Sequence, residues 1–134
     1  MTHPTKQTME QRRAAFAWTA SEEGIRQSGD KYTNLAKGAP ALIMASGLMQ
    51  TLAFLSAKGE AHHKQLLQHL VQWLAGQLGG TATHDAMSPF PPAGQADFER
   101  TMQALFHATP GQYRQATNES MLILRWIRQM ASAR

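Results

Sequence analysis

Basic side chains are the residues in this sequence whose type and spacing best match a chemical task. Arg114, Arg125 and Arg128 fall on one stripe of a predicted helix over residues 111–132, opposite its large apolar residues. Planar guanidinium groups donate hydrogen bonds in pairs to phosphate oxygens, so such a stripe matches a nucleic-acid backbone. A solvated helix face without any ligand would show the same spacing, and spacing alone leaves both interpretations open.

Four further basic residues stand on or between the predicted helices. Lys58 and Lys64 cluster near one interhelical turn. Lys37 lies on a short helix, and Arg13 lies on the first helix. The formal net charge of +4, from 13 Lys and Arg against nine Asp and Glu, permits contact with a polyanion but does not demand it.

The other polar residues do not form a catalytic group. Ser46 lies in Ala-Ser-Gly-Leu, which lacks the strand–turn–helix elbow that exposes a nucleophilic serine. Asp97 and Glu99 point to different sides of their helix, while Glu22 and Glu23 are adjacent and face solvent. A phosphate-binding glycine loop is also unsupported, because no strand is predicted to precede it. We therefore predict no catalytic residues and no enzyme activity.

Histidines are the remaining candidates for metal binding. His62 and His69 are separated by two helical turns, about 10.5 Å along the axis, which is too far for one ion. Glu60 and His63 are close by but do not complete the four-residue spacing of a helical zinc pair. The chain has no cysteine, so thiolate sites and disulfides are excluded. We predict no metal and no cofactor, with the histidines in solvent or at the core edge.

The composition predicts an all-α fold in a single domain over residues 1–134. Ala, Leu, Met and Gln dominate, Val occurs once, and no run alternates apolar and polar residues convincingly. Five or six helices should form a compact bundle, over residues 8–27, 31–37, 40–57, 60–77, 95–107 and 111–132. Residues 81–94 should form a Pro-rich loop with Phe90 docked on the core. The N-terminus shows no apolar run typical of a signal peptide, which favours the cytoplasm.

Residues 39–55 are apolar almost all the way round a helix. This pattern predicts one central helix buried on all sides, with a kink or break near Gly38 and Pro40 in its first turn. Gly47 inside it calls for a close approach by another helix or for a local break. Polar residues such as Gln50 interrupt the stretch, which argues against a membrane span.

The same stretch carries a resemblance to a known family. Residues 32–58 resemble the signature of the small all-helical subunit of the type III-B CRISPR Cmr effector complex, with matches at Tyr32, Lys37, Pro40, Gly47, Leu48, Leu52, Ala53 and Phe54. The last helix is similar too, at Tyr113, Ala116, Thr117, Glu119, Leu122, Leu124, Trp126, Arg128 and Ala131, as are residues 8–14. Ser46 departs from the pattern, because the family usually has asparagine there.

The resemblance implies a non-catalytic subunit that stacks in several copies beside backbone subunits and helps hold target RNA along the guide RNA. Its partners would be guide RNA, target RNA, the backbone subunit and copies of itself, with no membrane. The expected RNA-contacting residues, in falling order, are Arg125, Arg128, Arg114, Lys58, Lys64, Lys37 and Arg13. Two alternatives stay open: a protein–protein adapter without RNA contact, and a histidine-metal hydrolase that a metal assay would detect.

Overall fold

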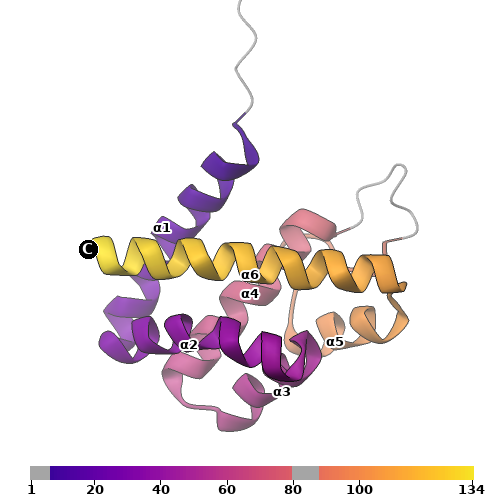
Figure 1. Ribbon diagram of the computed structural model, residues 1–134, viewed down its shortest axis with the longest axis horizontal. Helices are drawn as coiled ribbons and strands as arrows, with labels where there is room; N and C mark the ends of the chain where they lie inside the picture. Colours follow the sequence, from indigo (N-terminus) through magenta and orange to yellow (C-terminus); the bar gives the residue numbers. More distant parts are fainter. Residues whose placement is uncertain (1–6, 80–87) are drawn as a thin grey trace, which may run out of the picture.

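Six helices make up most of the structure. The computed structural model describes residues 7–79 and 88–134, and within those ranges it contains no strand, which confirms the all-α prediction. The helices are α1 (Met9–Ser28), α2 (Asp30–Ser46), α3 (Leu48–Lys58), α4 (Ala61–Leu78), α5 (Phe98–His107) and α6 (Pro110–Ala133). Figure 1 shows the long α6 lying across α1, α2 and α4, and it packs against all three. None of the described helices is long and apolar enough to span a bilayer.

Local sequence signals determine where most helices begin and end. The hydroxyl of Thr8 accepts a hydrogen bond from the Gln11 N–H at 3.1 Å, and the Gln11 side chain accepts one from the Thr8 N–H at 2.8 Å. This reciprocal pair of hydrogen bonds is a capping box, typical of threonine followed three residues later by glutamine, and Thr109 with Gln112 repeats it at the start of α6. Gly59, with φ +68°, ends α3 in the left-handed conformation.

The predicted break near Gly38, between helices over residues 31–37 and 40–57, is wrong. Helix α2 runs without a break from Asp30 to Ser46, and Pro40 lies inside it rather than in a first turn. Proline in a helix interior removes one hydrogen bond. Four residues of one α2 face are buried, namely Tyr32, Ala36, Ala39 and Ile43. This continuous apolar face offsets the lost hydrogen bond and holds the helix together across the proline.

The predicted central helix over residues 40–57 is two helices that meet at Gly47. Gly47 has φ +87° and ψ 165°, a conformation that side chains rarely adopt, so the chain breaks there. The Tyr113 hydroxyl from α6 accepts a hydrogen bond from the Met49 N–H at 3.1 Å, which satisfies one donor at the new helix start. Burial on all sides is also wrong, because Met44 is 80% exposed and Phe54 37% exposed. The break lets each half turn one face inward and the other to solvent.

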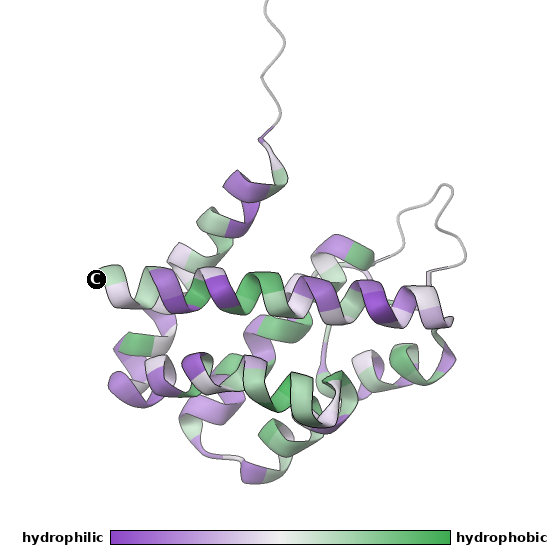
Figure 2. Cartoon of the chain, in the orientation of Figure 1, coloured by the Kyte–Doolittle hydropathy of each residue, from purple (hydrophilic) through white to green (hydrophobic). Residues whose placement is uncertain are grey.

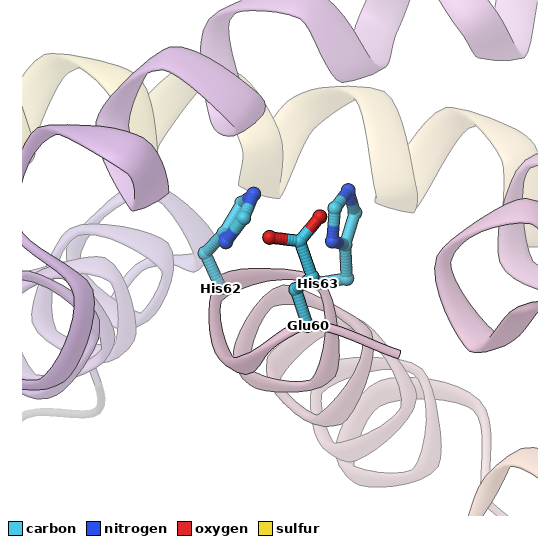
Figure 3. A group of neighbouring side chains, drawn as sticks. All are labelled: Glu60, His62 and His63. Atoms are coloured by element: carbon cyan, nitrogen blue, oxygen red, sulfur yellow. The ribbon is translucent and has the colours of Figure 1, made fainter. Parts of the chain in front are cut away.

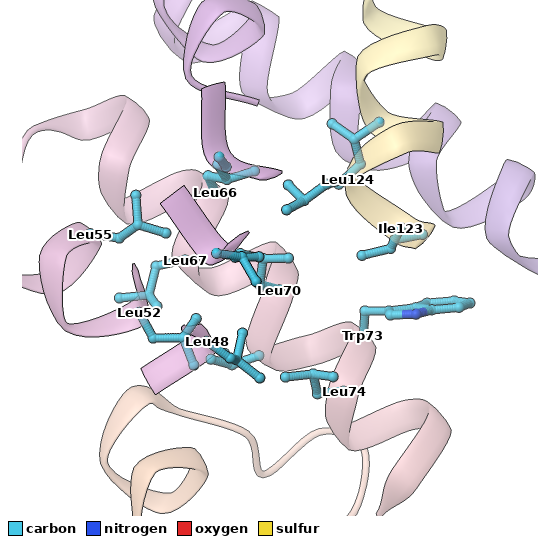
Figure 4. Packing of buried hydrophobic residues seen from close by; sticks show 14 of the residues in the cluster. Leu48, Leu52, Leu55, Leu66, Leu67, Leu70, Trp73, Leu74, Ile123 and Leu124 are labelled. Carbon is cyan, nitrogen blue, oxygen red and sulfur yellow. The ribbon is translucent and has the colours of Figure 1, made fainter. Parts of the chain in front are cut away.

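Leucines of α3 and α4 form the centre of the core, with Ile123 and Leu124 of α6 closing it (Figure 4). Leu52, Leu66 and Leu70 have no exposed surface. Each such side chain contributes about 1.5–3 kcal/mol through burial. Figure 2 shows hydrophilic and hydrophobic residues mixed along α1 and α6, as expected for helices with one face on this core.

The predicted loop over residues 81–94 is described in part. Residues 81–87 lie outside the described residues. Residues 88–94 form no helix, and Phe90 is 5% exposed and joins the core cluster, which confirms its predicted docking. The following helix begins later than predicted, because Asp97 caps it by accepting a hydrogen bond from the Arg100 N–H.

A buried hydrogen-bonded chain joins α1, α2 and α4. The Tyr32 hydroxyl lies 2.8 Å from Nδ1 of His69, and Nε2 of His69 lies 2.9 Å from the Glu23 carboxylate. A neutral imidazole protonated at Nε2 satisfies both contacts, accepting from the hydroxyl and donating to the carboxylate. Burial, which outweighs the attraction of Glu23, lowers the pKa of His69, and burial raises the pKa of Tyr32.

The break at Gly47 gives a stability prediction. We expect Gly47→Ala to lower the free energy of unfolding by about 1–3 kcal/mol, because a Cβ strains this backbone conformation. Gly38→Ala is the matched control: a Cβ there meets no atom within 4 Å, so the change should be neutral or stabilising by up to about 1 kcal/mol. Urea unfolding of the two variants measures the difference, and equal stability of Gly47→Ala and the parent would contradict the strain.

The neutral state of His69 gives a pH prediction. The unfolded chain takes up its proton near the ordinary pKa of 6.5, whereas the folded chain takes it up only at lower pH, so the free energy of unfolding should fall as pH drops below about 6.5. His63, whose pKa burial also lowers, contributes in the same direction. His69→Gln should flatten this pH dependence between about pH 7 and pH 5. Exposed His107→Gln should leave it unchanged in parallel unfolding measurements, and a slope retained by His69→Gln would refute the assignment.

Candidate nucleic-acid interface

Helix α6 turns its large apolar residues inward and its arginines outward, as predicted. Ile123 and Ile127 have no exposed surface, and Trp126 is partly buried against the core. Arg125 and Arg128 are both exposed. Because all of these side chains sit on one rigid helix, burial of the isoleucines fixes the direction of the guanidinium groups.

Arg114 joins Arg125 and Arg128 on the exposed side of α6, and these three residues are called the α6 arginine stripe below. Arg114 and Arg125 are about three turns apart, or about 16.5 Å, and Arg128 lies about 4.5 Å further along the axis. Within the described parts of the chain, none of these three arginine side chains forms a hydrogen bond or an ion pair. Their charge is therefore available to a ligand.

Glu119, the one acidic residue in the α6 sequence, is turned away from solvent. Its Oε2 lies 2.7 Å from Nη2 of Arg13, and its Oε1 accepts hydrogen bonds from Nε of Arg13 at 3.3 Å and from Nε1 of Trp73 at 3.1 Å. The Glu119 side chain is 15% exposed. The α6 arginine stripe consequently has no carboxylate of its own helix beside it in solvent.

Arg13 therefore has a different role from the one its position in the sequence suggested. Its side chain is only 16% exposed, and its guanidinium holds Glu119 across α1 and α6. Its partner lies 106 residues away, so no local pattern could reveal the pair. We leave Arg13 out of the proposed interface for this reason.

The predicted lysines form a second basic region. Lys58 ends α3 with its ammonium 5.6 Å from the Phe54 ring centroid, and Lys64 lies one turn into α4; both are exposed. Lys58 and Lys64 belong to α3 and α4, and not to the helix that carries the α6 arginine stripe. Figure 1 shows the connection between α3 and α4 on the other side of α2 from α6. Lys37 is exposed on α2. Residues 31–59 contain no acidic side chain at all.

Three residues that helical spacing had ruled out as metal ligands lie together in the structure. Glu60, His62 and His63 bring three potential ligand atoms within 4.8 Å of one another at the start of α4 (Figure 3). His69 lies elsewhere, in the hydrogen-bonded chain with Tyr32. Comparing His62 with His69 excluded a metal pair, but the adjacent Glu-x-His-His sequence was the signal that could have identified this cluster.

Comparison with known families places nearly the whole chain in one of them. Residues 9–134 match the family described as CRISPR-associated protein (Cas_Cmr5). The match confirms the resemblance to the small subunit of the type III-B CRISPR Cmr complex, which rested on residues 32–58 and on the last helix.

The different settings of Arg13 and Arg125 can be separated by unfolding. Arg13→Ala should lower the free energy of unfolding by about 1.5–3 kcal/mol, because it leaves a largely buried carboxylate with one fewer partner. Arg125→Ala should change it by less than about 0.5 kcal/mol, since that side chain is exposed and unpaired. Urea denaturation of both variants measures the free energy of unfolding. An Arg13→Ala variant as stable as the parent would show that Arg13 is not held by Glu119 and is available to RNA.

Proposed function

Because the chain belongs to the Cas_Cmr5 family of CRISPR-associated proteins, we propose that it is the non-catalytic small subunit of a type III-B effector complex and contacts guide and target RNA. It would work in the cytoplasm, packed against the backbone subunit and against copies of itself. Its contacts with RNA would go to phosphate oxygens.

The α6 arginine stripe is the observation that carries the RNA contact. It offers three exposed guanidinium groups with no internal acidic partner among the described residues, on a helix that is held rigidly by its buried face. Arginine donates bidentate hydrogen bonds to phosphate, and its charge stays fixed at all physiological pH values. A row of such groups along one helix suits a backbone that repeats its charge along a strand.

This contact would depend on charge and shape, not on base sequence. Phosphate contacts position a protein on nucleic acid but carry no sequence information. A guide-dependent complex must accept any guide, so contacts confined to the backbone match that requirement. Lys58, Lys64 and Lys37 would add charge from a second side of the molecule.

A protein–protein adapter is the second candidate, and exposed apolar residues favour it. Met44 is 80% exposed on α2, Phe106 58% exposed on α5, and Phe54 37% exposed on α3. Large exposed apolar side chains mark protein contacts when they gather in a patch. In an adapter the α6 arginine stripe would meet acidic side chains of a neighbour instead of phosphates.

Charge reversal on α6 tests the RNA contact in the assembled complex. Arg125→Glu combined with Arg128→Glu should weaken RNA retention. It should also make the negative slope of log affinity against log salt shallower by about 1.5 for each copy, because two phosphate contacts are lost. Filter binding of the reconstituted complex at several salt concentrations measures both quantities.

The matched control reverses two arginines that already have acidic partners. Arg26 lies 3.8 Å from Glu22, and Arg100 lies 4.0 Å from Asp97. Arg26→Glu with Arg100→Glu changes the net charge by the same amount, from +4 to 0, yet should leave the salt slope unchanged. Equal slopes for both double variants and the parent would remove the α6 arginine stripe from the RNA face. Assembly that survives RNA digestion but fails with the α6 variant would favour the adapter.

A further inference from the structure

The start of α4 gathers three side chains that can each donate an electron pair to a metal ion. Figure 3 shows the Glu60 carboxylate near the imidazole rings of His62 and His63, whose centroids lie 4.1 Å apart. One ligand atom from each residue lies within 4.8 Å of the other two. Four ligands around zinc, at about 2.0–2.1 Å, stand about 3.3 Å apart. The ligand atoms of these three side chains therefore need to approach one another only slightly to coordinate one ion.

His63 is the fixed member of the group, and its burial is otherwise unexplained. It is 6% exposed, and its buried Nδ1 has no hydrogen-bond partner among the residues that the structure describes. Its ring stands edge-on to Phe54, with centroids 6.0 Å apart, which restricts its rotation. An unpartnered buried nitrogen costs free energy, and a metal ion would use the electron pair that the fold leaves unused.

Glu60 and His62 can move to meet an ion. Glu60 is exposed, and although it stands at the N-cap position its side chain makes no capping hydrogen bond to α4. It also forms no ion pair with any residue that the structure describes. His62 is only partly buried, so both side chains retain freedom to rotate toward His63.

Space for solvent ligands adjoins the group. Glu60 and His62 line a cavity of 440 Å³ together with Gln27, Ser28 and Lys31. The Ser28 hydroxyl is buried without a partner, so it could hydrogen-bond a water molecule in this cavity. Three protein ligands with water at the remaining position form a common arrangement for zinc.

We propose that Glu60, His62 and His63 bind one divalent transition-metal ion, with Zn²⁺ as the best match to two imidazoles and a carboxylate. Lys58 and Lys64 lie nearby in the sequence, and their positive charges repel a metal ion. The Glu60 carboxylate offsets part of that repulsion. The ion would fasten the connection between α3 and α4 to the first turn of α4. It is independent of the proposed RNA contact, which rests on α6.

Titration of the untagged full-length chain with ZnCl₂ tests this site directly. Isothermal calorimetry should give one ion per chain, and Co²⁺ should give the visible absorption of a four-coordinate site. Glu60→Gln and His62→Gln each remove one ligand from a mobile position, so each should weaken Zn²⁺ binding at least about tenfold. Both changes leave buried His63 in place, which keeps the fold intact during the test.

His107→Gln is the matched control, because it removes an exposed histidine of α5 and leaves all three ligands in place. It should bind Zn²⁺ as the parent does. The proposal is overturned if the parent shows no saturable binding, if Glu60→Gln and His62→Gln bind as tightly as the parent, or if His107→Gln alone loses the ion.

Discussion

Burial of the apolar face of α6 is the constraint on which the rest of the structure depends. Ile123, Leu124 and Ile127 have no exposed surface, and the helix that carries them contacts α1, α2 and α4. A helix is rigid, so fixing one face fixes the direction of every other side chain on it. The direction of the arginines is therefore a consequence of hydrophobic packing, and no attraction to a ligand is needed to hold it in place.

Pairing inside the fold then determines which charges remain available. Glu119 is the one carboxylate of α6, and it is engaged by Arg13 and Trp73. Had Glu119 faced solvent, its negative charge would have stood on the same side of α6 as Arg114 and Arg125. Turning it inward uses Arg13, which belongs to α1, and leaves the exposed side of α6 with positive charge only. The same ion pair thus stabilises the bundle and separates the signs of charge on its surface.

Local patterns predicted much of this fold, while features that depend on distant contacts were missed. The start of α1 near Thr8 and the inward face of α6 follow from spacing within a few residues. The passage of α2 through Pro40 does not, because packing against other helices outweighs a local penalty there. Gly47 allowed two explanations from sequence, and only the arrangement of α2, α3 and Tyr113 decides for a break.

The candidate sites divide in the same way. The exposure of Arg125 and Arg128 was predictable from helical periodicity, because apolar neighbours determine it. The ion pair of Arg13 with Glu119 joins residues 106 positions apart, which no periodicity can indicate. His63 was expected in solvent or at the core edge, and its burial depends on how α3 folds back on α4 past Phe54.

The order of the helices along the chain also affects how the protein folds during synthesis. A nascent chain emerges from the ribosome N-terminus first, so the leucines of α3 and α4 emerge before Ile123 and Ile127. Until then the surface that α6 will cover on α1, α2 and α4 stays open to water. The core therefore stays incomplete until α6 has been made, and the apolar residues that α6 covers are exposed before then.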